Sequence, residues 1–110
     1  PAMAQSMNAE AFHSRAMKLQ NKGATAIFSM GEIKKLSAEG RAATAKAREA
    51  RRAAIAAGKS PRYCPPEGPQ SMHSSEFMTR LSAIPSAQRA KIDMVEATTR
   101  ILAVKYPCHG

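Results

Sequence analysis

Two cysteines, Cys64 and Cys108, constrain the fold of this chain more than any other feature. Cys64 lies in the motif Tyr63-Cys64-Pro65-Pro66, and Cys108 ends the motif Tyr106-Pro107-Cys108. Between them lie two helical patterns separated by Ile84-Pro85-Ser86. A disulfide would join the start of one helical hairpin to its end. In the chain-entropy model, closing a loop of about 44 residues is worth about 4 kcal/mol. The alternative is a pair of buried thiols.

The cysteine count and the N-terminal residues both bear on the compartment. An even, small number of cysteines in a chain with few aromatic residues suits an oxidising compartment. The first residues read Pro1-Ala2-Met3-Ala4-Gln5, and Ala2-x-Ala4 has the small-x-small form that a signal peptidase cleaves after. The alternative is that residues 1–4 come from a vector or form a flexible terminus. We expect an exported, periplasmic protein, with residues 5–110 forming one domain. No run of the sequence approaches the ~20 apolar residues of a membrane span.

The first half of the chain contains two predicted helices. Asn8 is a good N-cap for a helix over residues 9–22, and Gly23 is a plausible stop. We expect Ile27 and Phe28, in the connector that follows, to dip into the core. Although residues 24–28 could form a short strand, no second strand is predicted to pair with them.

A long alanine-rich helix is predicted from Ser29 to about Ala57, with Glu32 completing a capping box. Small and apolar residues alternate at spacings of three and four and form one stripe: Ile33, Leu36, Gly40, Ala43, Ala47, Ala50 and Ala54. Such a stripe lets another helix approach closely. Because it is long for so small a domain, we predict a homodimer.

The second half of the chain begins with an irregular segment at residues 58–71, which contains four prolines and two glycines. A helix over about 72–83 follows, with Ser71 or Ser74 as its cap. Pro85 interrupts the pattern, and a further helix runs over about 86–105. The predicted fold is therefore an all-α, four-helix domain with one long alanine-rich helix and a disulfide-stapled C-terminal helical hairpin.

The net charge of +9 is unevenly distributed along the chain. Residues 31–62 hold nine basic residues against three acidic ones, a net charge of +6. Arg41, Arg48 and Arg52 share one side of the long helix and form a candidate partner-binding face. A basic surface suits an acidic partner, whether a protein patch, an anionic membrane face or nucleic acid. With no helix-turn-helix signature and no aromatic stacking platform, nucleic acid is disfavoured. The alternative is an ordinary solvated face.

Motifs for catalysis, metals and cofactors are missing from the sequence. His13, His73 and His109 lack the spacing of metal ligands and read as surface histidines. The acidic residues read as surface ion pairs, and no G-x-S-x-G occurs. Gly58-Lys59-Ser60 lacks the glycine and the strand that a phosphate-binding loop requires. We predict no enzymatic activity and no cofactor.

Residues 60–108 resemble the Rap/Tai-type immunity proteins, in which an aromatic-Cys-x-Pro motif and an aromatic-Pro-Cys motif flank two helices. The matching positions are Tyr63, Cys64, Pro65, Pro66, Gly68, Phe77, Leu81, Ala97, Ile101, Ala103, Tyr106, Pro107 and Cys108. The resemblance covers under half of the chain and does not include the long helix. No inhibitory motif of the family can be placed on this sequence.

The resemblance implies a small periplasmic helical protein, often dimeric, that does no catalysis. It would bind and neutralise a cell-wall-degrading amidase delivered by type VI secretion. Cys64 and Cys108 would form the bridge, with Tyr63 and Tyr106 packed beside it. The alternative hypothesis is an envelope stress or chaperone-like protein, which would respond to acidification by dissociating and binding client proteins.

Overall fold

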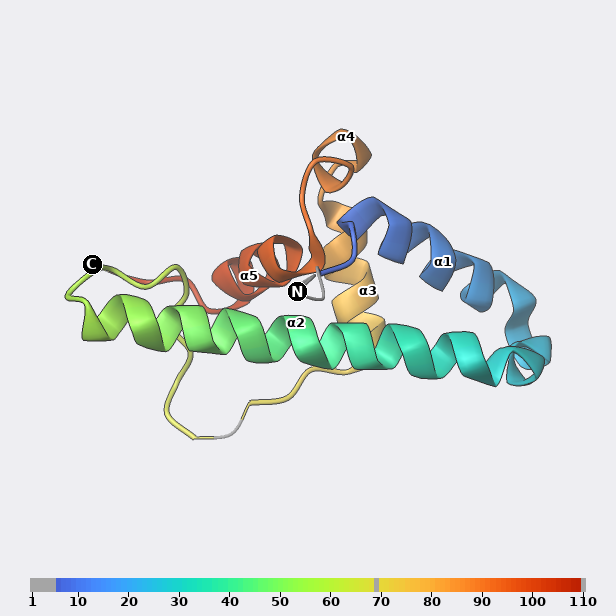
Figure 1. The fold of residues 1–110 in the computed structure, drawn as a ribbon, viewed down its shortest axis with the longest axis horizontal. Helices are drawn as coiled ribbons and strands as arrows, with labels where there is room; N and C mark the ends of the chain where they lie inside the picture. The colour runs from blue at the N-terminus through green and yellow to red at the C-terminus, as the bar shows by residue number, and fades with distance from the viewer. Residues whose placement is uncertain (1–5, 69, 110) are drawn as a thin grey trace, which may run out of the picture.

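A computed structural model describes residues 6–68 and 70–109, and every regular element in this part of the chain is helical. In chain order the elements are α1 (Ala9–Lys22), the 3-10 helix η1 (Gly23–Ser29), α2 (Met30–Ala56), α3 (Ser74–Ala83), α4 (Ser86–Arg89) and α5 (Met94–Lys105) (Figure 1). The predicted all-α fold, with its long alanine-rich helix and stapled C-terminal hairpin, is confirmed. The leader or vector residues predicted at 1–4 lie outside the described residues.

The ends of α1 follow local sequence signals. The side chain of Asn8 accepts hydrogen bonds from the backbone N–H groups of Glu10 and Ala11, at 2.9 and 3.0 Å. Gly23 ends the helix with a φ of 56°, a left-handed conformation that favours glycine. Both predicted boundaries are confirmed.

The connector between α1 and α2 differs from the prediction. It forms η1, and Ile27 and Phe28 are 64% and 87% exposed rather than buried. The predicted capping box is also absent: Ser29 makes no side-chain cap, and Glu32 instead receives two hydrogen bonds from Arg15. The physical reason is position. The connector turns the chain at one end of the molecule, away from α3 and α5, so the core does not extend to it (Figure 1).

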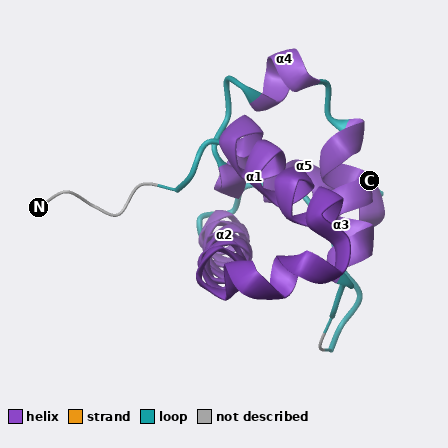
Figure 2. Ribbon diagram, turned by 90° about the vertical axis from the view of Figure 1, so that its right-hand side faces the viewer, coloured by secondary structure: helices purple, strands orange, loops and turns teal. Residues whose placement is uncertain are grey.

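The small-residue stripe of α2 packs within the chain. Leu36, Ala43 and Ala47 are buried, and α2 packs more extensively on α5 than on any other element. Figure 2 looks along α2 and shows the other helices gathered to one side of it. The homodimer stays a prediction. Because Leu36, Ala43 and Ala47 of the stripe are already buried inside the molecule, a second copy would have to use the exposed remainder of α2.

The single C-terminal helix predicted over 86–105 is instead two helices, α4 and α5. Asp93 begins α5 by accepting a hydrogen bond from the backbone N–H of Glu96 at 2.9 Å. The residues just before α5 pair with the segment preceding α1: Met94 N–H donates to Met7 O, and Ala9 N–H donates to Ile92 O. These long-range bonds use backbone groups that a continuous helix would need.

The start of α3 also differs from the prediction. It begins at Ser74, two residues later than expected, and no side chain caps it. The predicted caps Ser71 and Ser74 are therefore not used.

One hydrophobic core joins all the longer helices. The ring of Phe12 from α1 meets that of Phe77 from α3 edge to face, with centroids 6.3 Å apart. The buried apolar residues of this core are Ala9, Phe12, Ala16, Leu36, Ala43, Leu81, Met94, Ala97 and Ile101. Four of the nine are alanines, so each burial removes little apolar surface from water. Covalent and polar ties between the helices therefore matter more than in a core rich in leucine.

The C-terminal hairpin is closed by the predicted disulfide between Cys64 and Cys108, whose Cα atoms lie 4.9 Å apart. Next to the bridge, the backbone N–H of Cys64 donates to the carbonyl of Tyr106 at 2.8 Å. The bridge spans 44 positions of the sequence. It therefore fixes the exit from α5 against the segment that leaves α2.

We expect the double substitution Cys64→Ala/Cys108→Ala to lower the free energy of unfolding by about 4 kcal/mol, because the bridge removes loop-closure entropy from the unfolded chain. Urea denaturation of the oxidised protein and of the variant measures this difference. Reductant should shift only the wild-type midpoint. A loss below about 1 kcal/mol would show that the bridge contributes little to the unfolding equilibrium.

Candidate functional site

The motif around Cys64 is anchored on α2. Tyr63 is buried, and the guanidinium of Arg51 lies 5.7 Å from the centroid of its ring. The Nε of Arg51 also donates to the carbonyl of Tyr63 at 3.0 Å. Arg51 therefore contacts both the ring and the backbone of Tyr63, the residue before Cys64. These contacts hold the disulfide against the C-terminal part of α2.

The motif around Cys108 is more exposed. Tyr106 is half-buried, and its hydroxyl donates to Oε1 of Gln70 at 3.2 Å. Pro65 is half-buried, whereas Pro66 and Pro107 are exposed. The structure brings both aromatic-cysteine-proline motifs together at the disulfide, and their described contacts are structural.

A cluster of charges ties the irregular segment to α5. Arg62 donates two hydrogen bonds to the carboxylate of Glu96, at 2.6 and 2.8 Å, and Arg100 donates one at 2.8 Å. The hydrogen bonds from Arg62, followed by those from Arg100, lower the pKa of Glu96 to about 2, while partial burial opposes the shift. A second carboxylate, Glu76, is held in the same way by Lys105 and Arg80, which lower its pKa.

The predicted basic face lies on the surface of α2. Arg41, Arg48 and Arg52 are all exposed, on the side of the helix opposite buried Ala43 and Ala47. In the part of the chain that the structure describes, none of the three guanidinium groups has a hydrogen bond or an ion pair. The three side chains of this arginine face (Arg41, Arg48 and Arg52) start within about 40 degrees of one another around the helix axis, because intervals of seven and four residues return to nearly the same side of a helix. Three guanidinium groups are thus available to one partner.

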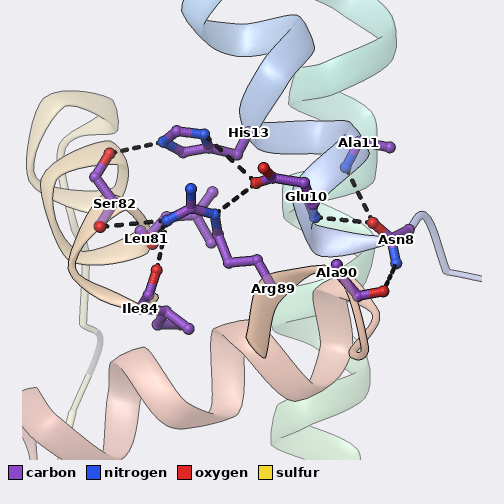
Figure 3. A network of polar contacts seen from close by, with 9 residues as sticks. All are labelled: Asn8, Glu10, Ala11, His13, Leu81, Ser82, Ile84, Arg89 and Ala90. Carbon is purple, nitrogen blue, oxygen red and sulfur yellow. Dashed lines mark hydrogen bonds and ion pairs between the residues drawn. The ribbon is translucent and has the colours of Figure 1, made fainter. Parts of the chain in front are cut away.

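The sequence pattern did not predict that Arg89 is buried. Arg89 is 6% exposed, and its Nε donates to Oε1 of Glu10 at 2.7 Å. Its Nη1 lies within hydrogen-bonding distance of three carbonyl groups at the end of α3, those of Leu81, Ser82 and Ile84. Figure 3 shows the guanidinium between α1 and the end of α3. It therefore joins α1, α3 and α4 by charge-assisted hydrogen bonds.

The sequence signal for this network is the run of unpaired carbonyls that ends α3 before Pro85, followed within a few residues by a basic side chain. The single helix predicted over 86–105 hid that signal, because a straight helix after Pro85 does not turn Arg89 back toward the end of α3.

His13 belongs to the same network and is half-buried, so its interpretation as a surface histidine is wrong. Its Nε2 lies 2.9 Å from the hydroxyl of Ser82, and its Nδ1 lies 3.8 Å from Glu10 (Figure 3). Burial first, and then the charge of Arg89, lowers the pKa of His13, while Glu10 opposes the shift. The predicted surface positions of His73 and His109 are confirmed.

Residues 6–68 and 70–109 contain no group of three or more His, Cys, Asp or Glu side chains that could hold a metal ion. None of their helices is both long and apolar enough to cross a membrane.

A shallow, open depression on α3 is lined by Ser75, Glu76, Thr79, Arg80 and Ala83. Its carboxylate is already paired with Arg80 and Lys105.

Comparisons of the chain with protein-family models, with curated proteins and with solved structures found no match. The resemblance of residues 60–108 to the Rap/Tai-type immunity proteins therefore stays a prediction that rests on the cysteine motifs.

We expect Arg89→Met to lower the free energy of unfolding by about 3 kcal/mol, because it leaves buried carbonyl groups without donors. Arg80→Met is the matched control: Arg80 forms a half-exposed pair with Glu76 four residues earlier, and its loss should cost less than about 1 kcal/mol. Urea denaturation measures both. Equal losses for the two variants would contradict the role of Arg89.

We expect the charge cluster at Glu96 to make stability depend on pH. The pKa of Glu96 falls from 4.5 to about 2 on folding, so folding favours the ionised carboxylate. Its contribution is fully present above pH 4.5 and is lost as the pH falls toward 2. The stability difference between wild type and Glu96→Gln should therefore shrink over this interval and stay constant above it.

The matched control is Glu67→Gln, because Glu67 is exposed and has no hydrogen bond or ion pair in the described part of the chain. Urea denaturation at a series of pH values measures all three proteins. A difference for Glu96→Gln that does not change with pH would contradict the assignment.

Proposed function

We propose that this protein is a non-catalytic, periplasmic binding protein that neutralises a cell-wall-degrading amidase, in the manner of the immunity proteins that residues 60–108 resemble. On this proposal it acts by covering the partner's active-site cleft. The observation that carries the binding role is the arginine face of α2. The resemblance alone suggests the kind of partner.

The arginine face supports binding because its three charges have no hydrogen-bond or ion-pair partner among residues 6–68 and 70–109. Elsewhere, acidic side chains neutralise arginines: Glu32 pairs with Arg15, and Glu96 pairs with Arg62 and Arg100. Along α2 the three arginines of the face point away from the core. Arginine forms planar, bidentate hydrogen bonds with carboxylates, so this arrangement suits an acidic protein surface. Such complementarity chiefly accelerates association and sets specificity.

Rigidity supports the same proposal. The opposite side of α2 packs on α5, and Arg51 ties the helix to Tyr63 beside the disulfide. A face on a helix held in this way loses little conformational entropy when it binds. The disulfide also favours an oxidising compartment, where a periplasmic partner would be met.

We expect the purified protein to inhibit a type VI-delivered cell-wall amidase from the same source, measured as the release of soluble fragments from peptidoglycan. Arg48→Glu, at the middle of the arginine face, should weaken inhibition at least about tenfold, which corresponds to about 1.4 kcal/mol. Lys91→Glu is the matched control, because Lys91 is exposed on the α4–α5 connection and undergoes the same charge change.

Equal weakening by Arg48→Glu and Lys91→Glu would show that net charge matters and the arginine face does not. If no such amidase is inhibited by the wild-type protein, the immunity role is wrong, whatever the variants do. If the protein binds the amidase without inhibiting it, the proposed partner is correct, but the protein does not cover the active-site cleft of that partner.

The chaperone-like alternative predicts a different behaviour. On acidification an oligomer would dissociate and the protein would suppress aggregation of unfolded clients. Light scattering of a client protein across pH distinguishes the two, since an immunity protein should leave client aggregation unchanged.

A further inference from the structure

The turn between α1 and α2 carries three exposed apolar side chains at one end of the molecule. Phe28 is 87% exposed, Ile27 64% and Met30 47%. Figure 1 shows this turn at the end of the long axis opposite to the C-terminus, projecting beyond α3 and α5. We call these three residues the apolar tip. The apolar tip lies on this projecting turn, and because contact of apolar side chains with water is unfavourable, their exposure calls for a physical reason.

Ordered contacts hold the turn that carries the apolar tip. The hydroxyl of Thr25 donates to the carbonyl of Lys22 at 2.7 Å, and Nζ of Lys22 donates to the hydroxyl of Ser29 at 2.7 Å. The Arg15–Glu32 pair joins α1 to α2 just below the turn. The apolar side chains are therefore presented outward by a hydrogen-bonded 3-10 helix.

The charge around the apolar tip is strongly positive. Residues 15–35 contain five basic residues and one acidic residue, a net charge of +4. The one carboxylate, Glu32, is already neutralised by Arg15. Lys18, Lys34 and Lys35 are exposed and have no hydrogen bond or ion pair in the described part of the chain. The apolar tip is thus flanked by lysines on the last turns of α1 and the first turns of α2.

We propose that the apolar tip inserts into the headgroup region of an anionic phospholipid bilayer, with the flanking lysines on the lipid phosphates. Aromatic and aliphatic side chains ringed by lysines are the combination that binds such interfaces, because burial of apolar surface and attraction to anionic lipid act together. Lysine suits this role, since its flexible stem lies along apolar material while its ammonium group stays hydrated.

A bilayer fits the shape of the apolar tip better than a protein does. A stable protein interface buries about 800 Å² on each partner, and three side chains on a projecting turn reach that area only inside a matching cavity. A bilayer needs no such complementarity. The contact would hold the protein at a membrane surface without spanning it.

This inference does not depend on the proposed function. The apolar tip lies at the start of α2, whereas the arginine face lies farther along the helix, so each surface has its own variants. If the protein does not bind lipid, the effects of Arg48→Glu and Lys91→Glu on amidase inhibition are still expected to differ. If it does not inhibit the amidase, it is still expected to bind anionic vesicles.

The test is sedimentation of the oxidised 110-residue chain with vesicles of phosphatidylglycerol and phosphatidylcholine, compared with vesicles of phosphatidylcholine alone. We expect binding to the anionic vesicles to be at least about tenfold tighter than to the neutral ones. Phe28→Ser should weaken it at least about tenfold. Val104→Ser is the matched control, because Val104 is 73% exposed on α5, away from the tip, and should bind as wild type does.

A fluorescent reporter tests insertion directly. The chain contains no tryptophan, so Phe28→Trp introduces a single one at the apolar tip. Its emission should shift to shorter wavelength on addition of anionic vesicles, while that of Val104→Trp should not. The double charge reversal Lys34→Glu/Lys35→Glu should abolish the preference for anionic lipid.

Four outcomes would overturn the proposal. They are absence of binding to anionic vesicles, equal binding to neutral vesicles, equal weakening by Phe28→Ser and Val104→Ser, and no emission shift for Phe28→Trp. Gel filtration of Phe28→Ser without lipid provides a further check. If that substitution converts a dimer into a monomer, the apolar tip contacts a second copy of this chain instead of a membrane.

Discussion

The position of α5 is the constraint on which the rest of the structure depends. Its start is held by Asp93 and by the backbone bond between Met94 and Met7, and its end by the bond between Tyr106 and Cys64 beside the disulfide. Between these points it carries the buried Met94, Ala97 and Ile101 of the core. Because α2 offers mostly small side chains to α5, the attraction between the two helices is weak per residue. Fixing both ends of α5 compensates for that weakness.

Polar ties replace apolar area elsewhere in the fold as well. Arg89 joins three helices through Glu10 and the carbonyl groups that end α3, and the Arg62–Glu96–Arg100 cluster joins the irregular segment to α5. Each such network gains strength because its donors are charged and several bonds share one side chain. In the described part of the chain, the carboxylates at positions 10, 32, 76 and 96 are used in pairs of this kind.

The use of these carboxylates inside the molecule leaves a surplus of positive charge on its surface. That surplus is concentrated on α2, where the arginine face lies opposite the packed side, and around the apolar tip at its start. The two surfaces differ in chemistry. Arginines on a rigid helix suit carboxylates of a folded partner, whereas lysines around exposed Phe28 suit a fluid, anionic interface. If both proposals hold, the protein would bind its partner enzyme while it is held at a membrane surface.

Local signals in the sequence determined much of this fold. Asn8 and Gly23 bound α1 because a side-chain cap and a left-handed glycine act within one turn of the chain. Pro85 interrupts the helical hairpin for an equally local reason, and the spacing of Cys64 and Cys108 within matching motifs predicted their bridge. The exposed arginine face also followed from periodicity alone.

Tertiary structure decided what depends on distant segments. The break between α4 and α5 arises from bonds to residues more than eighty positions away, the burial of Arg89 requires α1 beside the end of α3, and the exposure of Phe28 depends on where the core ends. Hydrophobicity told us that Phe28 should seek burial, but only the packing of the other helices determines whether any core lies within its reach.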